Sequence, residues 1–309
     1  MKRRVVTVAL TLGAFLVGHS VSAQRSSNPL IDLWSQNKPA FGVFVPNEAQ
    51  RPANPAGAPA GAPAGAPAGA PGGGAPGQGR GGGGQGPRVK PVYTEAGGEK
   101  LGANALYDYV FLNLEGGYDS AAVKAIAAGL KKSASGNRRV ALIVRVPAFH
   151  EDAAAGRAHL REVFAAGADG ITFPHVESVD EGKQILAAAQ AEKISVWSPG
   201  NPKGDKILMM MLEDPAAVAQ AAEFATLKGY SLLACGIGSL RGALKGDAAG
   251  AEAGVQKVLA ETKRAKLVNM LTATTQDVEQ RVKEGFLGIL AQGQNQDEAI
   301  KTGRALAKR

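Results

Sequence analysis

The segment Arg139–Ser178 constrains the fold of this chain more than any other. An apolar run at Val140–Val144 is followed by an amphipathic stretch and then by a second apolar run at Ile171–Phe173. Strand, helix and strand at such short spacing are the pattern of a parallel βαβ unit. Parallel α/β folds bind ligands at the carboxyl edge of their strands. We therefore expect a site in the loops that follow these two strands.

The same alternation recurs along most of the chain. Eight strand-like runs begin near residues 40, 109, 140, 170, 207, 231, 267 and 286, and a further strand-like piece at 193–197 would lie in a loop. Eight β/α units predict an α/β fold of the (β/α)8, or TIM-barrel, type. An open, doubly wound sheet is the alternative. It is disfavoured because no strand is followed by a Gly-x-Gly-x-x-Gly loop, and Gly236-Ile-Gly238 lacks the third glycine.

Residues 1–23 have the pattern of a secretory signal. A basic start at Lys2–Arg4 precedes an apolar stretch, and Val21–Ala23 resembles a cleavage site. A transmembrane anchor is the alternative, but the apolar run is shorter than the roughly 20 residues that span a bilayer. We expect an exported protein, periplasmic or extracellular, with no membrane span after signal cleavage.

Residues 46–93 contain almost no apolar side chain larger than alanine. Proline recurs every four residues from Pro55 to Pro71 within Pro-Ala-Gly-Ala repeats, and a glycine run follows. Such a segment cannot bury enough surface to offset its ordering entropy, so we expect disorder. A strand-like piece precedes it, so we interpret it as an insertion after the first strand. The alternative is a tether between the signal and a domain that begins near Thr94.

These boundaries divide the chain into four parts. Residues 1–23 are the signal, 24–45 an N-terminal helix and the first strand of the barrel, 46–93 the insertion, and 94–309 the remainder of the barrel.

The pattern of charge and the cysteine content argue against a nucleic-acid-binding protein and a protein stabilised by disulfides. The formal net charge is +8, but no basic run is interleaved with aromatic residues, so we expect no nucleic-acid partner. Cys235 is the only cysteine, which rules out an internal disulfide. Its apolar surroundings in the sequence indicate a small buried side chain rather than a nucleophile.

Several short segments occur in an order and at a spacing that resemble one enzyme family. They are Phe41–Phe44, Asp108–Glu115, Val144–Pro147, Gly167–Ile171, Pro174–Val176, Met211–Glu213 and Gly236–Leu244. Together they resemble the HpcH/HpaI aldolase/citrate lyase family, metal-dependent class II aldolases built on a TIM barrel, of which this chain would be a divergent member. The resemblance covers the chain from about Asn28 to its end, apart from the insertion.

The resemblance implies a carbon–carbon lyase that acts on a small 2-oxo acid of the 4-hydroxy-2-oxo acid type. The reaction would pass through an enolate that a divalent metal, Mg²⁺ or Mn²⁺, stabilises. No other cofactor is implied, and family members commonly form homo-oligomers.

The family's site residues are carried over by position. Arg145, in Val-Arg-Val-Pro, matches the arginine that stabilises the enolate, and the alternative is a structural ion pair. Glu213 follows an apolar strand and matches the metal-binding glutamate. We expect proton transfer and further substrate contacts from residues in neighbouring loops: Glu115 or His175 for proton transfer, and Gly236, Gly238 and Ser239 beside Arg145 for the substrate.

Two positions depart from the family pattern. Ser239 stands where a metal-binding aspartate is expected, and Gly116 stands where a histidine is expected. These departures favour an alternative, a non-catalytic barrel that binds a small carboxylate or a protein partner. A third hypothesis makes the insertion itself the functional part, as a tether to the cell envelope or to a partner.

Overall fold

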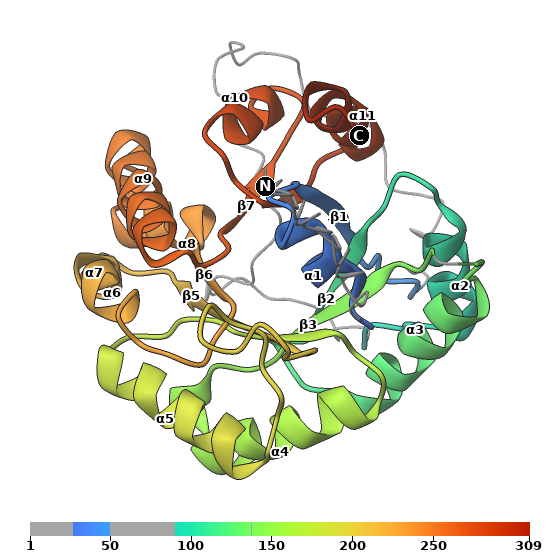
Figure 1. Cartoon of the computed structure of the whole chain (residues 1–309), viewed down its shortest axis with the longest axis horizontal. Helices are drawn as coiled ribbons and strands as arrows, with labels where there is room; N and C mark the ends of the chain where they lie inside the picture. Colours follow the sequence, from blue (N-terminus) through green and yellow to red (C-terminus); the bar gives the residue numbers. More distant parts are fainter. Residues whose placement is uncertain (1–26, 50–89, 137) are drawn as a thin grey trace, which may run out of the picture.

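A computed structural model describes residues 27–49, 90–136 and 138–309. Eight parallel strands form a ring that helices surround (Figure 1). The strands are β1 (Ala40–Phe44), β2 (Tyr109–Asn113), β3 (Ala141–Arg145), β4 (Gly170–Phe173), β5 (Ile207–Leu212), β6 (Leu232–Cys235), β7 (Met270–Ala273) and β8 (Gly288–Ala291). Their order is β6-β5-β4-β3-β2-β1-β8-β7, and a bridge between Leu232 and Val268 joins the two ends. The predicted (β/α)8 barrel is confirmed.

Each strand is followed by one or more helices, and one further helix precedes the first strand. The helices are α1 (Pro29–Trp34), α2 (Glu95–Ala103), α3 (Ser120–Lys132), the 3-10 helix η1 (Phe149–Glu151), α4 (Ala153–Ala165), α5 (Val179–Ala191), α6 (Pro215–Ala219), α7 (Ala221–Phe224), α8 (Ile237–Ala243), α9 (Ala248–Ala265), α10 (Val278–Lys283) and α11 (Gln296–Leu306). Asp119, Asp152 and Ser178 each accept a hydrogen bond from a backbone N–H in the first turn of the helix that follows. No helix in the described ranges is long and apolar enough to cross a membrane.

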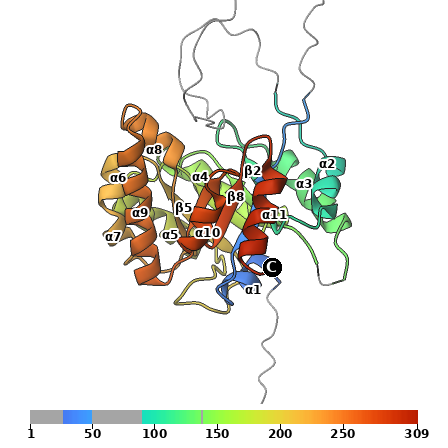
Figure 2. The same ribbon diagram turned by 90° about the horizontal axis from the view of Figure 1, so that it is seen from above.

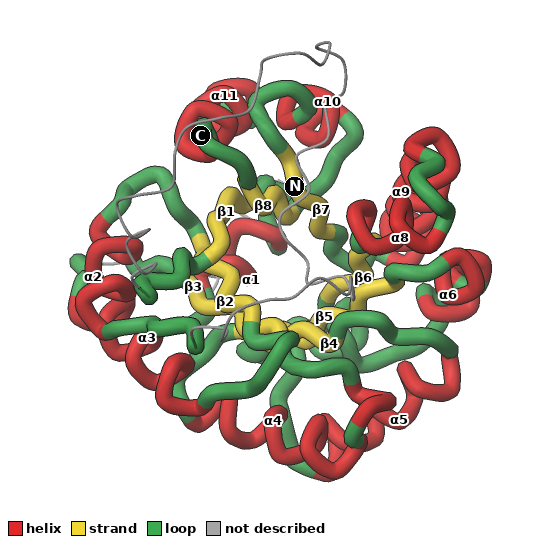
Figure 3. Tube along the Cα trace, turned by 180° about the vertical axis from the view of Figure 1, so that it is seen from behind, coloured by secondary structure: helices red, strands yellow, loops and turns green. Residues whose placement is uncertain are grey.

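Alternation along the strands divides the apolar core into two layers. On β2, Val110 and Leu112 face the helices, whereas Tyr109 and Phe111 belong to a cluster inside the barrel. The inner cluster also contains the apolar side chains of α1. Figure 3 shows α1 across the ring of strands, and Figure 2 shows it at one end of the barrel.

Hydrogen bonds identify that end as the amino end of the strands. Trp34 Nε1 donates to Leu287 O, just before β8, over 2.8 Å. The Asn28 side chain donates to Asp169 O, just before β4, over 3.2 Å. Because α1 closes the amino end, the carboxyl end of the barrel is the one open to a ligand.

The described ends of the predicted insertion lie side by side between β1 and α2. Glu48 N donates to Val92 O, and Val92 N donates to Asn47 Oδ1, each over 2.9 Å. Thr94 Oγ1 donates to Glu48 Oε2 over 2.8 Å. The chain therefore leaves the barrel and returns to it at one place, as expected for an insertion after the first strand. Residues 50–89 and the predicted signal 1–23 lie outside the described residues.

Two strand boundaries differ from the sequence prediction. β7 and β8 begin a few residues later than expected, because the residues before them connect the elements at the amino end of the barrel. Val268 makes an isolated bridge with Leu232, and Asn269 Oδ1 accepts a hydrogen bond from Leu287 N over 3.0 Å. The piece at 193–197 lies in the loop before β5, as predicted, with one bridge from Val196 to Lys206.

Candidate functional site

Four ionisable side chains meet at the carboxyl end of the barrel. Arg145 ends β3, Glu115 and His175 lie in the loops after β2 and β4, and Glu213 directly follows β5. Neighbouring parallel strands carry their last residues to one edge, which explains why positions far apart in the sequence meet here. The structure thus brings together the residues to which the sequence assigned chemical roles. They are the enolate-stabilising Arg145, the metal ligand Glu213, and the proton-transfer candidates Glu115 and His175.

Arg145 forms the centre of the group. Its Nη2 lies 2.9 Å from Glu115 Oε1 and 2.9 Å from Glu213 Oε2. The Glu213 side chain is only 2% exposed, so its charge requires a partner, and the guanidinium supplies one. The ion pair that was the alternative interpretation of Arg145 is therefore present, and it lies inside the candidate site.

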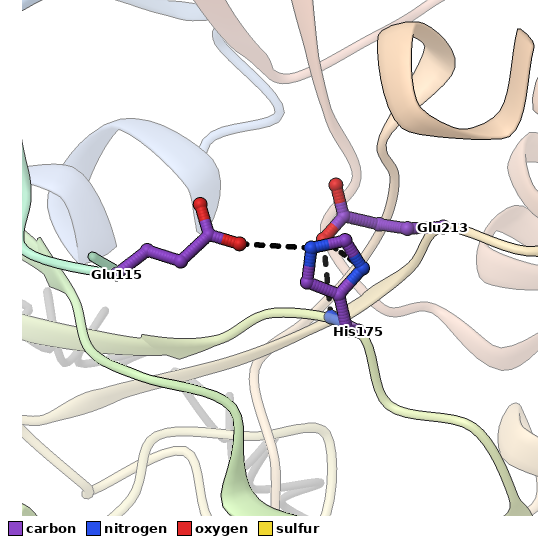
Figure 4. Close-up of side chains that lie close together, drawn as sticks. All are labelled: Glu115, His175 and Glu213. Carbon is purple, nitrogen blue, oxygen red and sulfur yellow. Dashed lines mark hydrogen bonds and ion pairs between the residues drawn. The ribbon is translucent and has the colours of Figure 1, made fainter. Parts of the chain in front are cut away.

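His175 lies between the two carboxylates (Figure 4). Its Nε2 is 2.8 Å from Glu115 Oε1 and its Nδ1 is 3.4 Å from Glu213 Oε2. Its backbone N–H also donates to Glu213 Oε2 over 3.0 Å. The residue has a φ of 50°, a left-handed conformation that is uncommon for a residue other than glycine. Both the ring and the backbone of His175 are thus tied to the site.

These contacts shift the pKa values of two groups in opposite directions. Burial raises the pKa of Glu115, but the hydrogen bond from His175 and the charge of Arg145 outweigh it, so the net pKa is lowered. The hydrogen bond to Glu115 raises the pKa of His175, and the charge of Glu213 acts in the same direction against burial. The pair therefore favours an ionised carboxylate beside an imidazolium when nothing else is bound.

The loop after β6 shapes the position of Glu213. A Cβ added to Gly236 would lie 2.3 Å from Glu213 Oε1, so a larger residue here would displace this carboxylate. Around Gly238 a Cβ would meet nothing within 4 Å, and Ser239 is exposed in the first turn of α8. The substrate contacts predicted for these three residues remain predictions, but Gly236 has a structural role that the sequence did not indicate.

The donor set fits a divalent metal ion. Glu115, His175 and Glu213 each offer one ligand atom, and these atoms lie within 4.8 Å of one another. Carboxylate oxygens suit Mg²⁺ and Mn²⁺, and an imidazole nitrogen is accepted by transition metals. The sequence assigned only Glu213 to the metal. Glu115 and His175 could also have been predicted as metal ligands, because each follows a strand that neighbours β3 or β5, at the same edge of the barrel.

Two further residues of the inner barrel face the site. Thr172 is paired with Arg145 in the register of β3 and β4, and it is fully buried. Its neighbours in β4 belong to the outer layer of the core, so Thr172 itself faces inward. Within the described ranges, Thr172 Oγ1 and Arg145 Nε are buried atoms without a hydrogen-bond partner. Met211 lies two residues before Glu213 and packs against the inner cluster. Period-two alternation would have placed both residues inward from the sequence alone.

Comparison with known proteins agrees with this architecture. The family model for HpcH/HpaI aldolase/citrate lyase matches residues 100–301. A search among curated proteins finds no significant match.

Solved structures of similar fold cover nearly the whole chain. An HpcH/HpaI aldolase/citrate lyase family protein from Burkholderia cenocepacia J2315 has a TM-score of 0.60 at 16% identity, over 91% of this chain and 98% of that one. An HpcH/HpaI aldolase from Desulfitobacterium hafniense DCB-2 has a TM-score of 0.58 at 15% identity, over 90% and 95%. Citrate synthase SbnG has a TM-score of 0.57 at 15% identity, over 90% and 96%. These structural similarities support the fold, and the family model extends through the strands that carry Glu115, Arg145, His175 and Glu213, so the chain belongs to the HpcH/HpaI aldolase/citrate lyase family.

Proposed function

We propose that this protein is an exported carbon–carbon lyase that cleaves a 4-hydroxy-2-oxo acid into a smaller 2-oxo acid and an aldehyde. The observation that carries the proposal is the position of Arg145, whose Nη2 lies between the carboxylates of Glu115 and Glu213 at the open end of the barrel. A permanent positive charge beside two possible metal ligands suits a reaction that develops negative charge on a carbonyl oxygen.

The reaction requires one proton acceptor and one site for negative charge. Removal of the proton from the 4-hydroxyl group lets the C3–C4 bond break, which releases the aldehyde and leaves the electron pair in an enolate. Protonation of that enolate at C3 gives the 2-oxo acid product. A divalent metal held by the group around Glu213 would polarise the 2-oxo group and stabilise the enolate.

Arg145 and its neighbours divide the remaining tasks. The guanidinium is held in place by its ion pairs, so its charge needs no reorganisation when the enolate oxygen becomes negative. Glu115 and His175 are the accessible members of the group, with side chains 28% and 41% exposed, and they contact each other. They are therefore the two candidates for proton transfer, whereas buried Glu213 is better suited to holding a cation.

Export and assembly belong to the same proposal. The pattern of residues 1–23 supports secretion to the periplasm or beyond. Family resemblance supports a homo-oligomer. Cell fractionation and the mass of the purified protein in solution test these two statements independently of activity.

The direct test is an assay of the purified mature protein with Mn²⁺ or Mg²⁺. We expect pyruvate release from members of a panel of 4-hydroxy-2-oxo acids. The pyruvate is measured through its reduction in a coupled assay. Arg145→Met is expected to reduce kcat/KM by at least about 100-fold, which is the loss seen when one donor to a developing oxyanion is removed. The matched control is Arg157→Met, which breaks an ion pair with Glu192 on the helical surface and should leave the rate unchanged. Absence of turnover across the panel would refute the lyase.

Two observations favour a second candidate, a barrel that binds a small carboxylate without cleaving it. Ser239 and Gly116 replace residues that the family pattern places at the metal and in proton transfer. The Arg145 guanidinium would still bind a carboxylate. Saturable binding of pyruvate or oxaloacetate without turnover, lost in Arg145→Met, would support this candidate.

A further inference from the structure

We propose that His175 is a metal ligand, and that it forms with Glu115 and Glu213 a mixed nitrogen and oxygen donor set. This set would replace the carboxylate that the family pattern expects at Ser239. The inference rests on the proposed function, since it concerns the ion of that site. It goes further by naming the third ligand and the class of metal.

The distances within the group suit one shared ion. Two ligand atoms at right angles around an ion at about 2.1 Å lie roughly 3 Å apart. One nitrogen of the His175 ring can bind the ion, and its Nε2 is 2.8 Å from Glu115 Oε1. One ligand atom from each of the three residues lies within 4.8 Å of the other two. The three residues come from three separate loops, so their convergence is a product of the tertiary fold rather than of chance proximity along the chain.

The backbone of His175 also contacts the site. A φ of 50° at a residue other than glycine costs about 1–3 kcal/mol and persists where the surroundings impose it. In this conformation His175 N donates a hydrogen bond to Glu213 Oε2, 3.0 Å long. The strained conformation therefore sets the imidazole beside the carboxylate of the proposed ligand.

Charge and the buried polar atoms beneath the group also favour a bound cation. A ring that binds a metal ion through nitrogen is neutral, and two carboxylates and one guanidinium then leave a net negative charge, which favours a dication. Beneath this group, the fully buried Thr172 directs an unpartnered hydroxyl into the barrel next to Arg145. Buried polar atoms are normally satisfied, so a water or a ligand oxygen is expected there.

A nitrogen ligand changes which ion the site prefers. Mg²⁺ favours an all-oxygen shell, whereas imidazole suits transition metals such as Mn²⁺, Co²⁺ and Zn²⁺. A ring nitrogen that binds the ion cannot accept a proton at the same time. The second carboxylate oxygen of Glu115 then becomes the proton acceptor. Of the two candidates for proton transfer, Glu115 and His175, this leaves Glu115.

The test is pulsed electron paramagnetic resonance of the full mature protein loaded with Mn²⁺. We expect a nitrogen hyperfine coupling of directly bound imidazole in the wild type and its loss in His175→Asn. Asparagine is the replacement of choice because it tolerates the left-handed backbone. Calorimetry should show Mn²⁺ affinity reduced by at least about 10-fold in this variant, with a smaller effect on Mg²⁺.

His150→Asn is the matched control. His150 also lies near two glutamates, 3.3 Å from Glu181 and 3.8 Å from Glu177, in the loop after β3. This variant should keep both the nitrogen coupling and the affinity.

Three results would overturn the ligand assignment: Mn²⁺ bound without nitrogen coupling, coupling lost in His150→Asn instead, or no Mn²⁺ binding at millimolar concentration. If His175→Asn fails to fold, the spectra of the wild type, His150→Asn and His159→Asn together still decide the question. Lyase turnover with an all-oxygen spectrum would refute only the role of His175, whereas nitrogen coupling without turnover would refute only the lyase.

Discussion

Gly236 and Glu213 are in direct contact at the carboxyl end of the barrel. A Cβ on Gly236 would lie 2.3 Å from Glu213 Oε1 and 2.7 Å from Glu213 Cγ, closer than real Cβ contacts allow. Glycine at this position is therefore a condition for the Glu213 carboxylate to reach both Arg145 and the backbone of His175.

Gly236→Ala should accordingly impair the site more than the fold. The added methyl group displaces the Glu213 carboxylate, and we expect at least about a 10-fold loss in Mn²⁺ affinity, comparable to the loss of a supporting contact at a metal site. Isothermal titration calorimetry measures this directly. Gly242→Ala, in helix α8 that follows Gly236, is the control, because an added Cβ there would meet none of the described atoms within 4 Å, and it should bind Mn²⁺ as the wild type does. Equal affinity in both variants would show that the contact is unimportant.

Removal of the Arg145 charge should destabilise the protein as well as inactivate it. Arg145→Met leaves Glu213, only 2% exposed, without its guanidinium partner, and breaking a buried ion pair on one side costs about 3–5 kcal/mol. Urea denaturation measures this change in the free energy of unfolding. The double variant Arg145→Met/Glu213→Leu should recover part of the loss, because the buried carboxylate is also removed, and the loss of this ligand should weaken metal binding. A single variant as stable as the wild type would contradict the predicted electrostatic role.

The barrel could be predicted from the sequence because its determinants are local. Each strand is a short apolar run, and a capping side chain such as Asp119, Asp152 or Ser178 marks the helix that follows. Arg145 and Glu213 were also within reach, because a charged residue that ends an apolar strand points toward the edge where ligands bind. These signals need no knowledge of contacts between distant segments.

The composition of the donor group could not be predicted, because it depends on long-range geometry. His175 lies in a loop with a φ of 50°. The sequence around Pro174 has no simple pattern that predicts this conformation or the contact of the ring with two carboxylates. The same holds for Gly236, whose importance comes from a side chain in another loop. Strand alternation places Thr172 inward, but whether its hydroxyl has a partner among the described residues depends on the tertiary structure around it.

Deletion of the Pro/Ala/Gly-rich insertion should leave the barrel intact. Glu48 and Val92 are joined by a backbone hydrogen bond of 2.9 Å, so the two ends of the segment already meet in the fold. We expect a variant in which a short Gly/Ser linker replaces residues 50–89 to keep its circular dichroism spectrum, its urea midpoint and its metal affinity, because loop-closure entropy varies slowly with length. Altered localisation or association with an unchanged fold would support a tethering role for the insertion. A loss of folding would show that the segment contributes to the barrel.

Cys235 should behave as a buried thiol whose ionisation opposes folding. The prediction of a small buried side chain is confirmed, since Cys235 is 5% exposed in β6. Burial raises its pKa to about 12, and the charge of Glu213 adds to the shift. In the unfolded chain the thiol ionises near pH 8.5, so from there to about pH 12 the unfolded state loses a proton that the folded state keeps. The contribution of this group to stability therefore falls as pH rises through that window, by about 1.4 kcal/mol per pH unit.

Comparison with Cys235→Ala isolates this effect. The difference in free energy of unfolding between wild type and variant should change over pH 9 to 10.5 by roughly 2 kcal/mol, in favour of the variant at higher pH. Iodoacetamide should label the native wild type slowly at pH 8.5 and the urea-unfolded chain rapidly, because only the thiolate reacts. Rapid labelling of the native protein would mean that Cys235 is accessible and ionised, contrary to its place in the core.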